Sequence, residues 1–197
     1  MLHISDGDKY TYKEHIFSIQ HLEGFYTKIL YQSIQQVESM LSHHQRVFLY
    51  RFDLHCKSYS HSNTVLSKFI SKLKYWVMTN YGTLRLGYIW VREHNPPTPA
   101  QHYHLAIMID GSKVDTPYLI SRKIGALWTG KSYFPASAYY RMKRNNYQSI
   151  QDAIYRISYL AKVATKSAKK KTTNAYSCSR IKLHPTKIAF NFDNIHP

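Results

Sequence analysis

Two apolar runs on either side of a proline-rich segment limit the folds that this 197-residue chain can adopt. The runs are LRLGYIWVRE (84–93) and HYHLAIMID (102–110), and the residues HNPPTPAQ separate them. Proline lacks the backbone N–H that strands and helices use, so the separating segment predicts a turn. Two strands joined by such a short turn pair antiparallel, which predicts a hairpin. The sequence therefore favours a fold with an antiparallel sheet.

Other segments predict the elements around this hairpin. RVFLYRFDLHC (46–56) is dense in aromatic and aliphatic residues and predicts a further strand. Apolar residues at helical spacing predict helices over 12–44, 65–82, 115–129 and 149–166. The expected class is α+β, a central antiparallel sheet flanked by helices. Residues 1–44 are expected to form an N-terminal helical extension and 45–197 the main domain with a basic tail, together one compact unit.

The charge balance favours a polyanionic partner. Lysine and arginine number 27 against 11 aspartates and glutamates, a formal net charge of +16, and the 18 tyrosines suit stacking on nucleic-acid bases. The two cysteines are too few and too far apart for a disulfide framework or a zinc-cysteine site. No apolar run is long enough to cross a membrane. These features predict a cytoplasmic protein that binds nucleic acid and no membrane.

The histidines of HYHLAIMID predict a metal site. His102 and His104 occupy alternating strand positions, so both side chains project from one face of the sheet. Glu93 ends the preceding strand and is the favoured third ligand, and Asp53 and His55, which share a face of the first strand, remain alternatives. Two imidazoles and one carboxylate suit Mg²⁺ or Mn²⁺ acting on a phosphodiester.

The last predicted helix contains AIYRISYLAKVATK. Tyr155, Tyr159, Lys162 and Lys166 recur at helical spacing and would share one face of the helix. Tyrosine can attack a phosphate and hold a covalent intermediate, and a nearby lysine favours the phenolate. The alternative is that the tyrosines pack on the sheet while the lysines reach solvent. The lysine-rich run that continues this segment is either a DNA-contacting tail or a solvated linker; it comprises Lys166, Lys169, Lys170 and Lys171.

In their order along the chain, RFDLH, GYIWVREH, HYHLAIMID and YLAKVATK resemble the motifs of a known family. A histidine pair around one hydrophobic residue, an acidic residue upstream and a later Y-x-x-K are similar to the HUH endonucleases of rolling-circle replication. More narrowly, the motifs resemble the gene II replication initiators of filamentous phages (inoviruses) and their prophage relatives. The resemblance spans about residues 46–166.

This resemblance implies a ferredoxin-like or RRM-like core and a cation held by His102 and His104. By motif position it implies Tyr159 as the nucleophile and Lys162 as the accompanying lysine, with Tyr155 as a second tyrosine of the kind that some phage initiators use. The implied activity is site-specific nicking and joining of single-stranded or origin DNA through a 5′-phosphotyrosine. The chain has no P-loop glycine motif, so the resemblance also implies reliance on a host helicase and polymerase.

Two alternatives remain at this point. A transposase or plasmid relaxase of the same HUH type would use the same residues for different biology. A non-catalytic DNA-binding protein of a prophage would use the histidines and tyrosines structurally. Convergence of the two histidines with Glu93, and the direction of Tyr159, distinguish the catalytic readings from the non-catalytic one.

Overall fold

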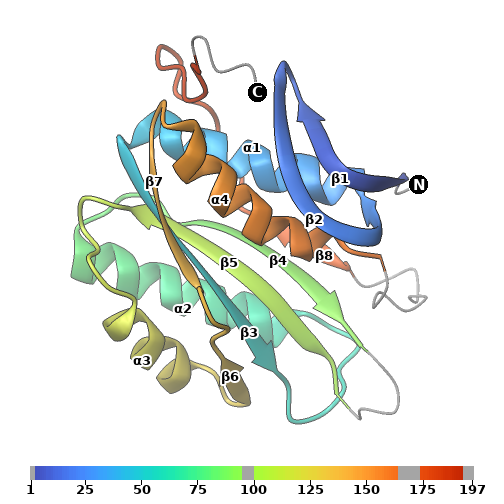
Figure 1. The fold of residues 1–197 in the computed structure, drawn as a ribbon. Helices are drawn as coiled ribbons and strands as arrows, with labels where there is room; N and C mark the ends of the chain where they lie inside the picture. The colour runs from blue at the N-terminus through green and yellow to red at the C-terminus, as the bar shows by residue number, and fades with distance from the viewer. Residues whose placement is uncertain (1–2, 95–99, 164–173, 193–197) are drawn as a thin grey trace.

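The computed structural model describes residues 3–94, 100–163 and 174–192 (Figure 1). Its helices are α1 (Thr27–His43), α2 (Thr64–Tyr81), α3 (Tyr118–Leu127) and α4 (Tyr147–Ser158), followed by a short 3-10 helix, η1 (Tyr159–Ala161). Its strands are β1 (Ile4–Tyr12), β2 (His15–Tyr26), β3 (Arg46–His55), β4 (Gly87–Glu93), β5 (His102–Asp110), β6 (Lys131–Tyr133), β7 (Tyr139–Lys143) and β8 (Tyr176–Cys178).

A six-stranded sheet forms the centre of the molecule. Its strands follow the order β6-β3-β5-β4-β8, and β7 also pairs with β3. All of these pairings are antiparallel. The predicted hairpin is the β4–β5 pair, and the predicted class, an antiparallel sheet flanked by helices, is confirmed.

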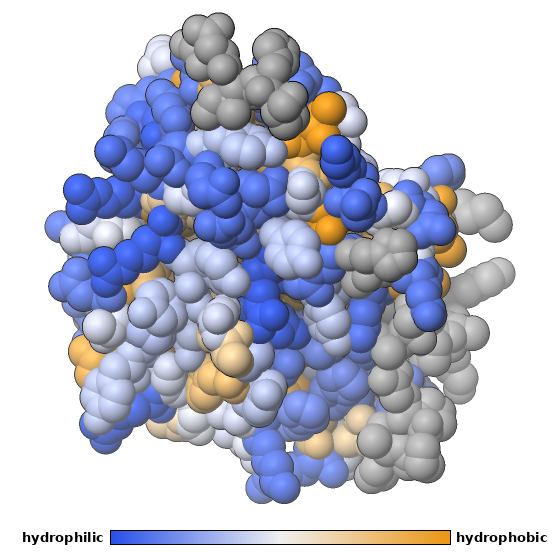
Figure 2. Space-filling view, viewed as in Figure 1, coloured by the Kyte–Doolittle hydropathy of each residue, from blue (hydrophilic) through white to orange (hydrophobic). Residues whose placement is uncertain are grey.

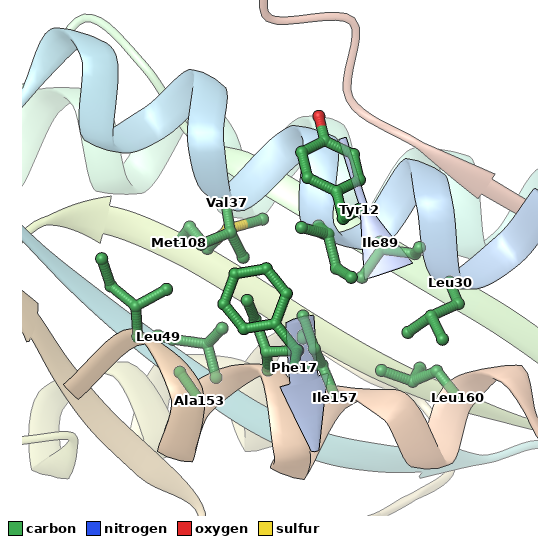
Figure 3. Close-up of a cluster of buried hydrophobic side chains, with 14 of the residues drawn as sticks. Tyr12, Phe17, Leu30, Val37, Leu49, Ile89, Met108, Ala153, Ile157 and Leu160 are labelled. Atoms are coloured by element: carbon green, nitrogen blue, oxygen red, sulfur yellow. The ribbon is translucent and has the colours of Figure 1, made fainter. Parts of the chain in front are cut away.

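Each face of this sheet has its own hydrophobic core, because alternate residues of a strand point to opposite faces. On one face the strands pack against α1, α4 and the β1–β2 hairpin, and Figure 3 shows Leu49, Ile89 and Met108 in this first core. On the other face Phe52 and Leu105 belong to a second core, which α2 and α3 close. The two layers of helices lie on opposite sides of the sheet (Figure 1).

The predicted N-terminal helical extension is wrong for residues 4–26. These residues form the antiparallel hairpin β1–β2, and only α1 of the predicted 12–44 helix is helical. Burial follows a period of two along β2, since Phe17 and Ile19 are buried while Ile16 is 48% exposed. Lys13, at φ 53, makes the tight turn between the strands. The apolar residues of this segment therefore fill one face of a strand rather than the stripe of a helix.

The β1–β2 hairpin also packs on the rest of the molecule instead of extending from it. Tyr12 and Phe17 lie in the same buried cluster as Leu49 and Ile157 (Figure 3). Gln151 of α4 accepts a hydrogen bond from the Ser18 N–H at 2.9 Å and donates one to the Ser18 carbonyl at 2.8 Å. The hairpin and α1 thus share one core with the sheet and help to fix α4.

The surface in the view of Figure 2 is mostly hydrophilic, with apolar side chains in small separate groups. Of the helices in the described residues, none is long and apolar enough to cross a membrane.

Candidate metal centre

Strand register brings the predicted metal ligands together. His102 of β5 lies opposite Glu93 of β4, and His104 lies two residues further along the same face of β5. Residues directly opposite one another on antiparallel strands have neighbouring side chains. The three therefore meet at one end of the sheet, on the face that also carries the first core.

The ligand atoms of these three residues form a compact group. One oxygen, Oε2 of Glu93, lies 3.2 Å from Nε2 of His104 and 3.5 Å from Nε2 of His102. One ligand atom from each of the three lies within 4.8 Å of the others. The side chain of Glu93 is 2% exposed, that of His104 8% and that of His102 17%. The group is thus buried on the Glu93 side and reaches solvent at His102.

Asp53 of β3 contacts His104 on the side of the ring that faces away from Glu93. It lies opposite His104 in the register, and its Oδ1 is 2.7 Å from Nδ1 of His104. An ionised carboxylate only accepts hydrogen bonds, so Nδ1 of His104 donates. In the neutral imidazole, the lone pair of Nε2, the atom that faces Glu93, is then available to a cation. A carboxylate that fixes the second nitrogen of a ligating histidine is typical of protein metal sites, so the residues present fit a divalent cation.

The charges around His104 stabilise its protonated form when no cation is bound. Burial lowers the pKa of His104, but its hydrogen bonds to Asp53 and Glu93 outweigh this effect, and the pKa is raised overall. Burial raises the pKa of Asp53, but the hydrogen bond from His104 and the positive charges of His104 and Arg51 lower it overall. The Asp53 carboxyl is therefore ionised at neutral pH and remains an acceptor for His104.

The alternative third ligands occupy other positions. Asp53 contacts His104 through the nitrogen that faces away from Glu93. His55 lies opposite His102 on β3 and stacks against its ring, with 5.3 Å between ring centroids. In the described part of the chain, the group of potential metal ligands comprises Glu93, His102 and His104 and includes neither Asp53 nor His55.

Tyr159 lies against this group. Its ring stands edge-on to the ring of His104, with 5.5 Å between centroids. Nζ of Lys162 donates a hydrogen bond to the Tyr159 hydroxyl at 2.5 Å. The guanidinium carbon of Arg51, a buried β3 residue, lies 4.8 Å from the centroid of the Tyr159 ring. The predicted nucleophile, its predicted lysine and the predicted metal ligands are thus neighbours.

The backbone around Tyr159 is held by the β1–β2 hairpin. The predicted helix over 149–166 ends earlier, because α4 stops at Ser158 and η1 follows. Beyond η1, Lys162 forms a bridge with Phe25, and the Val163 N–H donates to the Gly24 carbonyl at 3.0 Å. Gly24 has φ +88, and a Cβ there would lie 3.1 Å from Ile4, so glycine suits this close contact. The hairpin therefore contacts the chain just beyond η1, the short helix that begins with Tyr159.

Tyr155, the other predicted tyrosine, makes no hydrogen bond with the group of potential metal ligands in the described part of the chain. It is 47% exposed. The predicted DNA-contacting lysines lie outside the described residues; they are Lys166, Lys169, Lys170 and Lys171.

Two contributors to the site are missing from the sequence predictions. One is Arg51, which lies 3.3 Å from Asp53 and packs on Tyr159. Its signal was present, because alternation in RFDLH places Arg51, Asp53 and His55 on one face of the strand. The other is the β1–β2 hairpin, whose contact with residues 162 and 163 has no local sequence signal.

Comparison with known proteins identifies a family. The family model described as the YagK/YfjJ C-terminal domain matches residues 9–179, which is most of the chain. The chain belongs to the YagK/YfjJ C-terminal domain family. The range that this family model covers includes Glu93, His102, His104, Tyr159 and Lys162, and it also includes most of the β1–β2 hairpin. No curated protein and no solved structure matches the chain significantly.

Proposed function

We propose that this protein is a divalent-metal-dependent endonuclease and strand transferase that nicks and rejoins single-stranded DNA at the replication origin of a phage or prophage element. One observation carries the proposal: Tyr159, with its hydroxyl bonded to Lys162, lies against a buried group of Glu93, His102 and His104. The resemblance of the surrounding motifs to the HUH initiators of rolling-circle replication supports the same assignment.

The ligand group suits a cation that acts on phosphate. Mg²⁺ or Mn²⁺ held by Glu93, His102 and His104 would polarise the scissile phosphate. Within the protein, Asp53 keeps one proton of His104 on Nδ1, so a cation that binds would replace the other proton at Nε2. His102 is the most exposed of the three ligands, so the substrate phosphate would approach from its side.

Tyr159 would be the nucleophile. Its hydroxyl oxygen forms a bond to the scissile phosphorus, the bond from that phosphorus to the 3′ oxygen breaks, the leaving oxygen takes a proton, and the phenolic proton passes to solvent. The products are a 5′-phosphotyrosine and a free 3′-hydroxyl that can prime synthesis. Attack of a 3′-hydroxyl on the phosphotyrosine reverses these bond changes and rejoins the strand.

Lys162 and Arg51 would prepare Tyr159 for this attack. The ammonium group of Lys162 is bonded to the phenolic oxygen and so stabilises the phenolate. The cation of Arg51 lies over the ring at 4.8 Å and limits its movement. Holding a nucleophile in an attacking position can supply about 7–11 kcal/mol of the barrier, so this placement is the main catalytic device.

Covalent adduct formation tests the proposal. The protein is incubated with Mn²⁺ and single-stranded DNA that carries the element's own replication origin, and the mixture is resolved in denaturing detergent. We expect a protein–DNA adduct that EDTA abolishes. Tyr159→Phe removes the hydroxyl but keeps the ring, so it should abolish the adduct. Tyr155→Phe is the matched control one helical turn away and should retain it.

The outcomes separate the alternatives. An adduct that persists in Tyr159→Phe and disappears in Tyr155→Phe would show that the nucleophile is assigned wrongly. DNA binding without an adduct, unchanged by Mn²⁺, Mg²⁺ or chelator, would favour a non-catalytic DNA-binding protein. The sequences flanking the cut would then distinguish an origin nickase from a transposase or relaxase.

A further inference from the structure

The helices on the opposite side of the sheet from the metal ligands carry only positive charge. α2 and α3 contain Lys68, Lys72, Lys74, Arg122 and Lys123, and neither helix contains an aspartate or glutamate. The side chains of Lys68, Lys72, Lys74 and Arg122 are exposed, and that of Lys123 is half-buried. Solvated helix faces usually mix both signs of charge, so this one-sided composition fits a polyanion.

Exposed aromatic rings stand among these cations. Tyr75 of α2 is 74% exposed and Tyr118 of α3 is 62% exposed. Nζ of Lys123 lies 5.8 Å from the centroid of the Trp76 ring, which ties α3 to α2 at this place. Bases of a nucleic acid stack on such rings, whereas a small inorganic anion has no ring that could stack on them.

The surface between these side chains is hollowed along α2. One hollow, between α2 and α3, is lined by Ser71, Lys72, Tyr75, Trp76, Lys123 and Leu127. A second, along the first turns of α2, is lined in part by His61, Ser67 and Lys68. Ser71 and Lys72 line both hollows, so the two hollows adjoin at these residues. The α2–α3 surface is defined here as these two hollows with the exposed cations beside them.

We propose that the α2–α3 surface is a second binding site for single-stranded DNA, with the backbone beside Lys72 and Lys123 and a base stacked on Tyr75. Aromatic rings interleaved with lysines are the arrangement that binds single strands without reading their sequence. The second core separates this surface from Glu93, His102 and His104. Binding here goes beyond the proposed nicking and does not depend on it.

Fluorescence anisotropy with a labelled oligothymidine of about 20 nucleotides tests this site, in EDTA so that no cation occupies the metal ligands. Loss of a stacked base weakens binding about 5- to 150-fold, so Tyr75→Ala should raise the Kd by this factor while Tyr75→Phe should not. Each phosphate contact contributes about 0.7 to the slope of log K against log salt for single strands. Lys72→Ala/Lys123→Ala should therefore lower the magnitude of this slope by about 1.4.

The double variant Lys28→Ala/Lys143→Ala is the matched control. It removes the same charge from two exposed lysines of α1 and β7, away from the α2–α3 surface, and should leave the slope unchanged. Equal losses in both double variants would overturn the proposal, because net charge alone would explain the binding. Unchanged affinity in Tyr75→Ala, or tighter binding of an acidic peptide than of DNA, would also overturn it. Intact binding without any adduct would remove the nicking proposal and leave this one standing.

Discussion

The two faces of the central sheet differ although the same strands build both. On the face under α2 and α3, β5 is apolar along its whole length, with Tyr103, Leu105, Ile107 and Ile109 all buried. On the face under α1 and α4, β5 has apolar Ala106 and Met108 in its second half. Its first half has His102 and His104 on this face. The neighbouring strands also change from apolar to charged side chains on this face. The change runs from Leu49 to Asp53 on β3 and from Ile89 to Glu93 on β4.

This difference separates a face that stabilises the fold from one that also holds the candidate site. Burying a charged group costs several kcal/mol unless partners compensate for its lost hydration, and apolar side chains at the same positions would avoid that cost. The partners present are charged groups of opposite sign, such as Arg51 with Asp53 and Glu93 with His104. Buried charged side chains that lower stability in this way are typical of functional sites.

The largest effect is expected on the apolar face. Leu105→Ala leaves a cavity in the second core, where Leu105 is fully buried, and should lower the free energy of unfolding by about 2–5 kcal/mol. Urea denaturation measures this loss. The folded variant should still bind Mn²⁺ with wild-type affinity in isothermal titration calorimetry. A large loss of Mn²⁺ affinity would mean that the two faces are coupled and that their roles do not separate.

A smaller effect is expected at Asp53, which contacts the proposed metal ligand His104. Asp53→Asn removes the charged acceptor that orients His104 and should weaken Mn²⁺ binding about 10- to 100-fold, as changes to such outer partners do. Asp110→Asn is the matched control, because Asp110 pairs with His44 at the other end of β5. Titration calorimetry should find Mn²⁺ affinity unchanged in Asp110→Asn. Equal losses in the two variants would contradict the role given to Asp53.

The smallest effect is expected where the hairpin meets α4. Gln151→Ala removes both hydrogen bonds to Ser18 and should cost about 1–2 kcal/mol of unfolding free energy. It should also slow adduct formation, because Tyr159 directly follows α4. Gln148→Ala is the control, since Gln148 is exposed on the same helix and its side chain, among the residues that the structure describes, donates to Asp152 alone. An undiminished rate of adduct formation in Gln151→Ala would show that the hairpin does not position Tyr159.

Much of the sheet was predictable because its signals are local. The alternation of HYHLAIMID and the proline-rich turn before it identify β5 and its pairing with β4, and this pairing brings Glu93 to His102. Spacing within YLAK placed Tyr159 beside Lys162, and the structure retains that contact although η1 replaces the expected α-helix. Sequence patterns can therefore predict contacts between neighbours along one strand or one helix.

The rest depends on contacts between distant parts of the chain. Ile16, Ile19 and Leu22 fit a helical stripe as well as a strand, and the strand is favoured by pairing with β1 and by burial of Ile19 in the first core. The contact of Arg51 with Tyr159 joins residues more than 100 positions apart, and Lys162, which donates to the Tyr159 hydroxyl, pairs with Phe25 of the β1–β2 hairpin. Such placement follows from the assembled core rather than from any short motif.

In the proposed function, Tyr159 and the group of Glu93, His102 and His104 form one nicking site. Mass spectrometry of the nuclease-trimmed adduct, formed on origin-bearing single-stranded DNA in Mn²⁺, tests it most directly. We predict a nucleotide linked through its 5′-phosphate to Tyr159 in the wild-type protein. We predict no such modification in EDTA or in a His104→Ala variant that remains folded. A modified Tyr155 with an unmodified Tyr159, or an adduct that forms equally well in EDTA, would contradict the claim.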